Sequence, residues 1–138
     1  MLYALLCYHD ESAVWSWTQE QNDAVMAQIA AVQEPLIKAG KMGPSLRLLP
    51  TTTATTLRKT QHPPLVVDGP FAETKEQLLG FYIIDVDDLE AALDIARDLA
   101  GANPGGAYEI RPVALYNPDH RPADPAHRPA ERAERIRS

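Results

Sequence analysis

Two side chains suited to acid–base chemistry stand at the ends of expected strands. His9 follows an apolar segment and is itself followed by Asp10 and Glu11. A nearby carboxylate raises the pKa of an imidazole and makes it a candidate general acid or base. Asp68 precedes a Gly-Pro turn, where its carboxylate could pair with His9 or hold a ligand. The alternatives are a half-solvated strand-end histidine and an aspartate that accepts backbone N–H bonds in the turn.

A second group of residues is suited to holding a ligand. Arg58, among threonines, could clamp a carboxylate, and Lys75 could neutralise an anion. Glu73 and Lys75 belong to a polar cluster just before an apolar segment, which favours the rim of a pocket. Phe71 and Tyr82 would suit an aromatic ligand. The alternatives are a solvated arginine, ion pairs that fix the loop to a partner subunit, and aromatic side chains that belong to the core.

Metal and cofactor sites have no recognisable pattern in this sequence. The chain has one cysteine, Cys7, and four histidines, without zinc-finger spacing. It has no glycine-rich phosphate loop and no serine nucleophile elbow. We therefore expect no metal and no cofactor, and we interpret Cys7, in an apolar strand, as an inert core residue.

Length and charge limit the class of protein. The chain has 138 residues, enough for one domain with its own core. A net charge of −6 argues against nucleic acid as the main partner. The longest apolar run, Leu2–Tyr8, is far shorter than the about 20 residues of a membrane span, and no basic residue precedes it as in a signal peptide. We therefore expect a cytoplasmic protein that does not bind membranes, with a domain over residues 1–116 and a Pro/Arg-rich tail over 117–138.

The elements that must position these residues form an α+β pattern. Thr18 with Gln21 predicts a capping box at the start of a long helix, and Gly40 predicts its end. Pro35, near that end, predicts a kink or a separated last turn. Alternation and periodicity predict strands over 2–8, 42–49, 79–86 and 108–113, helices over 18–39 and 88–100, and a hairpin of 55–60 with 65–68.

Without the hairpin this order is βαββαβ, which is the ferredoxin-like arrangement with two helices on one face of an antiparallel sheet. The strands over 2–8 and 79–86 are apolar on both faces. The face away from the helices would then be a bare apolar patch, which monomers rarely tolerate. We predict a homodimer that packs sheet against sheet, with a cleft between the sheets or under the hairpin. The alternative is a monomer whose hairpin and tail cover this face.

Several segments resemble one protein family. The segment DGPFAETKE at 68–76, the following QLLGFYIIDVDDLEAAL and the closing EIRPV resemble the DGPF group of the YCII-related family. The N-terminal YALLCYHDE and the hairpin segment TATTLRK are similar as well, so the resemblance covers about residues 1–116. It implies a dimeric α/β-barrel built from ferredoxin-like subunits.

The resemblance implies less about function. Shorter relatives are thought to use a His–Asp pair in a cleft, and one branch includes a dehydrochlorinase that acts on a chlorinated hydroxyquinol. Members of the DGPF group are often encoded beside sigma factors of the extracytoplasmic-function type. The histidine that shorter relatives carry early in the long helix is missing here, since residues 19–23 read QEQND.

Three classes of function follow from these observations. We expect a dimer that binds a small aromatic or acidic ligand, or a regulatory partner such as an extracytoplasmic-function sigma factor, in or near the dimer cleft. The alternative is a small cofactor-free lyase or hydrolase that uses His9 and Asp68 for acid–base chemistry. A purely structural module is the third hypothesis.

Overall fold

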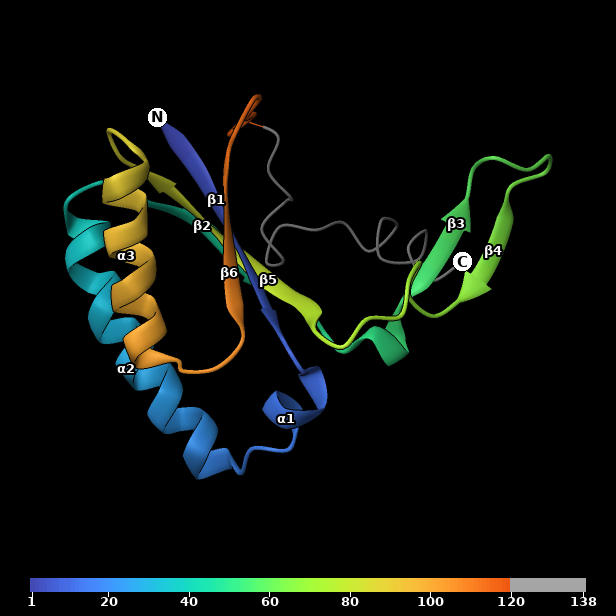
Figure 1. Ribbon diagram of the computed structural model, residues 1–138, viewed down its shortest axis with the longest axis horizontal. Helices are drawn as coiled ribbons and strands as arrows, with labels where there is room; N and C mark the ends of the chain where they lie inside the picture. Colours follow the sequence, from blue (N-terminus) through green and yellow to red (C-terminus); the bar gives the residue numbers. More distant parts are fainter. Residues whose placement is uncertain (120–138) are drawn as a thin grey trace, which may run out of the picture.

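The computed structural model describes residues 1–119 as a four-stranded antiparallel sheet with both long helices on one face (Figure 1). The strand order is β2-β5-β1-β6, and β3 and β4 form a separate two-stranded sheet. This is the predicted ferredoxin-like α+β fold with an inserted hairpin. The elements are β1 (Leu2–His9), α1 (Glu11–Trp15), α2 (Gln19–Lys38), β2 (Met42–Arg47), the 3₁₀ turn η1 (Thr51–Thr53), β3 (Thr55–Arg58), β4 (Leu65–Asp68), β5 (Gln77–Asp85), α3 (Leu89–Ala102) and β6 (Ala107–Pro112). The predicted tail over 117–138 lies almost wholly outside the described residues.

The two ends of α2 are fixed by the predicted residues. The Gln21 backbone N–H donates to Thr18 Oγ1 at 3.1 Å, and the Thr18 backbone N–H donates to Gln21 Oε1 at 2.9 Å, which completes the capping box. At the other end Gly40 has a φ of 71°, and the Lys41 N–H donates to the Leu36 carbonyl at 2.9 Å. This is the Schellman end for which glycine is favoured.

Some sequence-based boundaries were wrong. The last turn of α2 is not separated, because the helix continues through Pro35 and a proline removes only one N–H donor near an end that is well capped. Helix α3 begins after Asp88, whose carboxylate accepts from the Ala91 N–H, and it continues past Gly101. The short helix α1 and the turn η1 were not predicted, since neither is long enough for a periodic pattern.

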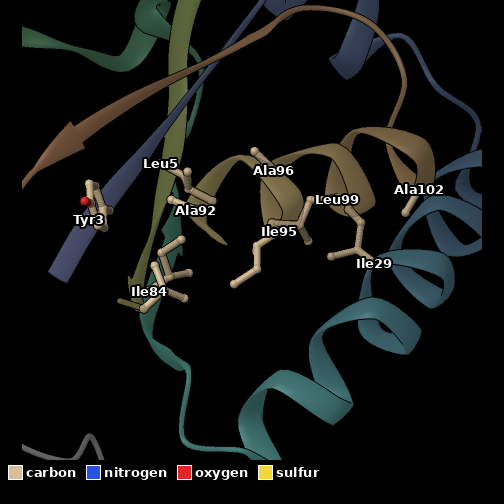
Figure 2. Packing of buried hydrophobic residues seen from close by; sticks show 10 residues of the cluster. Tyr3, Leu5, Ile29, Ile84, Ala92, Ile95, Ala96, Leu99 and Ala102 are labelled. Carbon is tan, nitrogen blue, oxygen red and sulfur yellow. The ribbon is translucent and has the colours of Figure 1, made fainter. Parts of the chain in front are cut away.

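The core lies between the sheet and the two long helices. Leu5, Ile84 and Leu99 are its largest fully buried side chains, from β1, β5 and α3. In Figure 2 the labelled side chains of α3 point toward the sheet and toward Ile29 of α2. Each fully buried side chain of this size stabilises the fold by about 1.5–3 kcal/mol. This packing fixes the helix-side face of the sheet, where the larger cavity lies.

The opposite face of the sheet carries no helix (Figure 1). One transverse row on this face aligns Leu46 of β2, Phe81 of β5 and Leu6 of β1. The row continues to Glu109 of β6, which forms an ion pair with Arg111. The central strands therefore present apolar side chains on both faces, as predicted, and within the described residues only the helix-side face is covered by secondary structure.

The hairpin β3–β4, which we call the arm (residues 55–68), stands away from the sheet on the side opposite the helices (Figure 1). Among the described residues, its strands pair only with each other, in the register Thr55↔Asp68 to Arg58↔Leu65. A two-stranded ribbon is marginally stable in water by itself. Four of its apolar side chains are nevertheless exposed: Leu57, Leu65, Val66 and Val67.

Candidate functional site

A cavity of about 350 Å³ lies between the helix-side face of the sheet and α2. Strands β1, β2 and β5 form its floor, and α2 forms its roof. The residues that line it are mostly apolar or neutral: Cys7, Val14, Trp17, Val25, Met26, Ile29, Gln33, Ser45, Leu46, Arg47, Leu79, Gly80, Tyr82 and Asn103. Among the residues that the sequence analysis selected for a ligand, Tyr82 lines this cavity, and its contact with an aromatic ligand stays a prediction.

Two small residues, Gly80 and Cys7, stand in the middle of the sheet at the floor of this cavity. Residues in register across neighbouring strands share a face, and one helix-side row reads Arg47, Gly80, Cys7, Tyr108 from β2 to β6. Gly80 has no side chain, and a Cβ there would lie 2.0 Å from the Leu46 carbonyl oxygen. The row thus has long side chains at its two ends, Arg47 and Tyr108, and the two small residues between them. We call the part of the row at Gly80 and Cys7 the trough.

Arg47 is the ionised side chain at the cavity, and the sequence analysis did not select it. Its guanidinium donates to Asn22 Oδ1 of α2 at 3.3 Å and lies over the Trp15 ring, 5.0 Å from the centroid. Burial raises the pKa of Tyr82, and the positive charge of Arg47 partly opposes this rise, so its field reaches the floor of the cavity. An arginine in an exposed strand position has no sequence signal of its own; only the register places it beside Gly80.

Apart from Arg47, the titratable side chains of this row and of its neighbour Tyr82 are neutral near pH 7. Burial raises the pKa of the Cys7 thiol to about 12, so the thiol keeps its proton and is a poor nucleophile. Burial also raises the pKa of Tyr82, helped by Cys7. Burial is again the main cause of the raised pKa of Tyr108. The trough thus contains hydrogen-bonding groups but no anion that would repel an acidic ligand.

Two buried polar side-chain atoms have no hydrogen-bond partner within residues 1–119. They are Asn103 Oδ1 and the Tyr108 hydroxyl, and both atoms are buried. Asn103 is the C-cap residue of α3 and lines the cavity, whereas Tyr108 stands beside Cys7 in the sheet. Neither residue was predicted as part of a site.

The structure places His9 and Asp68 in different sheets. His9 ends β1, and a Cβ on Gly105 would lie 2.6 Å from its Nε2 atom. Asp10 interacts with His9, but its carboxylate is also the N-cap of α1 and accepts from the Ser12 N–H at 3.0 Å. Asp68 ends β4 and is exposed. Within residues 1–119 no hydrogen bond or ion pair joins His9 to Asp68, and their acid–base role stays a prediction.

A second pocket, of about 270 Å³, lies at the base of the arm. Glu73 lines it, and its role in holding a ligand stays a prediction. The pocket is built from η1 and the loop after β4: Thr51, Thr52, Gly69, Pro70, Ala72, Glu73, Thr74 and Gln77. Glu11 supports it from outside, because its carboxylate accepts from the Thr51 N–H at 2.9 Å and from the Thr51 hydroxyl.

The other predicted ligand residues surround this loop without converging on one point. Arg58 donates to the Phe71 carbonyl at 3.2 Å, so part of its guanidinium holds the loop. The Phe71 side chain is 74% exposed. Lys75 is exposed and makes no ion pair with a described residue. No hydrogen bond in this part of the chain reaches the Asp68 carboxylate; the turn is held instead by the Gly69 N–H on the Ala54 carbonyl, at 2.7 Å.

No helix in the described part of the chain has the length and apolar character of a bilayer span. Residues 1–119 also contain no group of three or more His, Cys, Asp or Glu arranged to hold a metal ion.

Comparison with known proteins places the chain in a family. Residues 1–117 match the YCII-related domain. An uncharacterized protein of Rhizobium meliloti (strain 1021) is 56% identical over 124 residues, which are 89% of this chain and 100% of the relative. The assignment to the DGPF group stays a prediction. The chain belongs to the YCII-related family.

Proposed function

We propose that this protein binds a small aromatic ligand with one anionic group in the cavity under α2. This proposal rests on a cavity of about 350 Å³ whose lining residues are mainly apolar and include the ionised Arg47. Small-molecule sites are typically concave and apolar, with a few polar groups that set orientation. Trp17 and Tyr82 supply aromatic surface at the walls, where a planar ring would stack or meet an edge.

Arg47 would hold the anionic group of the ligand. A guanidinium binds a carboxylate through two parallel hydrogen bonds. Asn22 and the Trp15 ring already orient this side chain, so little freedom is lost when the ligand binds. Gln33 and Ser45 line the same cavity and add neutral donors.

Calorimetric titration with a panel of aromatic carboxylates, from benzoate to 2-naphthoate, tests this proposal. We expect at least one of them to bind the wild-type protein, and Arg47→Gln to weaken that binding by tenfold or more. Arg97→Gln is the matched control, because Arg97 pairs with Asp94 on the surface of α3. The proposal fails if no carboxylate in the panel binds, or if Arg47→Gln binds as tightly as the control.

We also propose that the protein is a homodimer in which the arm packs on a second copy. Leu57 and Val66 face the same side of the arm, because they are paired in register, and they are 55% and 63% exposed. The open sheet face, with its row of Leu46, Phe81 and Leu6, is a second apolar surface of the same chain. Twofold exchange would bury both surfaces in each copy.

Sedimentation velocity at micromolar concentration tests the dimer. We expect the wild-type chain to sediment as a dimer, and Leu57→Asp or Val66→Asp to shift it toward monomer, since each buries a charge in the interface. Thr60→Asp, at the polar tip of the arm, should leave the dimer intact. A monomeric wild type, or equal sedimentation of all variants, contradicts this proposal without affecting the ligand cavity.

A further inference from the structure

Gln33 and Ser45 are neutral polar residues on two facing walls of the cavity under α2. Gln33 belongs to α2, which forms the roof, and Ser45 belongs to β2 on the floor. Neither side chain forms a hydrogen bond within residues 1–119. Gln33 is half-buried, yet neither of its polar atoms is among the fully buried atoms that lack a partner. Its amide therefore has surface that a bound molecule can contact.

The chain path brings these two residues to the same level of the cavity. A tight turn joins α2 to β2, and the hydrogen bond from Arg47 to Asn22 shows that β2 returns along the helix. Gln33 lies about 8 Å before the end of α2, and Ser45 lies about 10 Å after the start of β2. Because side chains lean toward the start of their helix, Gln33 reaches toward the level of Ser45.

The cation of the cavity lies close to this level. Ser45 and Arg47 are two residues apart on β2 and point to the same face of the sheet, so their Cα atoms are about 6.6 Å apart. Both residues are exposed, whereas Ile29 and Gly80 in the same cavity are buried. A bound molecule therefore meets polar groups along the open edge strand and apolar surface further inside.

The chemistry of Gln33 and Ser45 matches an amide group. The Gln33 side chain has two N–H donors and a carbonyl acceptor, and the Ser45 hydroxyl both donates and accepts. An amide has one N–H and one carbonyl, so it can donate to one of these side chains and accept from the other. A methylene chain in the same place displaces water from both side chains and forms no hydrogen bond in return, which lowers affinity.

We propose that Gln33 and Ser45 form an amide-recognising subsite, and that the ligands are N-aroyl amino acids, in which an amide lies between the aromatic ring and the carboxylate. The carboxylate binds Arg47, the amide lies between Gln33 and Ser45, and the ring packs on the inner surface with Tyr82. This inference rests on the proposed function and adds the group that joins the ring to the anion. A site built to hydrogen-bond such a group rejects the analogue that lacks it.

A role confined to shaping the cavity makes a different prediction. If Gln33 and Ser45 serve only as walls, N-aroyl amino acids bind no more tightly than hydrocarbon acids of the same length. Substitution of either residue then changes the affinity for both kinds of acid by the same factor. The preference for the amide therefore separates the two roles.

The test compares two amides with their hydrocarbon counterparts by calorimetry: hippurate with 4-phenylbutyrate, and N-benzoyl-β-alanine with 5-phenylvalerate. The members of each pair share the ring, the chain length and the carboxylate. We expect the wild-type protein to bind at least one amide about tenfold or more tightly than its counterpart.

The variants assign this preference to the two residues. Gln33→Met and Ser45→Ala should each lower the preference at least about threefold, with the affinity for the hydrocarbon acid unchanged. Gln28→Met is the matched control, because Gln28 is an exposed residue of α2 that does not line the cavity. It should keep the wild-type preference.

The outcomes distinguish this inference from the proposal on which it rests. If the hydrocarbon acids bind through Arg47 and neither amide binds more tightly, the amide subsite is wrong and the anion site stands. If Gln33→Met and Ser45→Ala leave the preference unchanged, or weaken both kinds of acid equally, the subsite is also wrong. If benzoate or 2-naphthoate binds and none of these four acids does, the inference fails alone. If no aromatic carboxylate binds the wild-type protein, the inference fails together with the anion site.

Discussion

The guanidinium carbon of Arg47 lies 5.0 Å from the centroid of the Trp15 ring. This contact joins the edge strand β2 to the short helix α1, and the hydrogen bond from Arg47 to Asn22 adds α2. The cation at the cavity is therefore held by two elements besides its own. An arginine fixed in this way is better placed to bind a carboxylate than one that is free in solvent.

The Trp15 ring should therefore affect ligand affinity more than stability. An exposed cation–π contact contributes about 0.5–1 kcal/mol, and Trp15 is 45% exposed. We expect Trp15→Ala to weaken binding of an aromatic carboxylate about two- to fivefold, with a smaller effect on the urea midpoint. Trp15→Phe, which keeps an aromatic face, should bind more nearly like wild type. Equal affinity for wild type and Trp15→Ala would show that the ring does not position Arg47.

Gly80 should be the least replaceable glycine of the sheet. A Cβ at this position would lie 2.0 Å from the Leu46 carbonyl oxygen, which is backbone and cannot turn aside. We expect Gly80→Ala to lower the free energy of unfolding by about 3 kcal/mol, measured in urea. Gly101→Ala is the control, because it lies within α3 with open space around it and should stabilise the helix by about 0.5–1 kcal/mol. Similar losses for both would contradict the close approach of β2 and β5.

The fold was largely predictable from sequence because its signals are local. Thr18 with Gln21 and the apolar stripe through Ile29 specify α2, and alternation specifies β1 and β5. The short helix α1 escaped because five residues are too few for a periodic pattern. The continuous helix through Pro35 was missed because local propensity overstates the effect of one lost hydrogen bond in a helix that packs on a core.

The site was less predictable because it depends on register. Tyr82 was identified as an aromatic residue of a strand, but nothing in the sequence aligns Gly80 with Arg47 and Cys7. The irregularity of pairing after Cys7 changes which residues share a face beyond it. Asn103 comes from the end of α3, and only the tertiary fold brings it to the cavity. Sequence reasoning instead selected residues around the turn at Asp68, where motifs are visible.

Glu11 should stabilise the pocket at the base of the arm. Its carboxylate accepts from the backbone N–H and from the hydroxyl of Thr51, and its own N–H donates to Gln77 Oε1 at 3.0 Å. Each hydrogen bond to a charged group contributes about 1.5–3 kcal/mol to stability. We expect Glu11→Ala to lower the free energy of unfolding by about 2 kcal/mol and Glu11→Gln by less.

Amide hydrogen exchange gives the local readout for Glu11. The Thr51 amide should lose protection from exchange in Glu11→Ala. Amides in α3 should keep their protection once the change in the global free energy of unfolding is subtracted. Glu34→Ala is the control, since Glu34 pairs with Lys38 on the exposed side of α2 and such pairs contribute little. Unchanged protection at Thr51 would show that η1 is held by other contacts.

The Cys7 thiol should make stability fall at alkaline pH. Burial raises its pKa to about 12, whereas an unfolded cysteine titrates near pH 8.5. Below about pH 8.5 both states hold the proton, and the stabilisation is fully present. Above that pH the unfolded chain releases a proton that the folded chain keeps, so the free energy of unfolding falls by up to about 1.4 kcal/mol per pH unit. Partial exposure of Cys7 makes this slope an upper value.

Comparison with Cys7→Ala isolates this contribution, because tyrosines and lysines titrate in both proteins. Urea unfolding from neutral pH to about pH 10 should show a steeper loss of stability for wild type than for Cys7→Ala. The same burial should make the native thiol react slowly with a disulfide reagent at mildly alkaline pH, and quickly once the chain is unfolded. The contrary result is a parallel loss of stability in the two proteins together with a fast reaction of the native thiol with the reagent. It would mean that the trough is open to water at Cys7. Its floor would then not be the dry surface that an aromatic ligand requires.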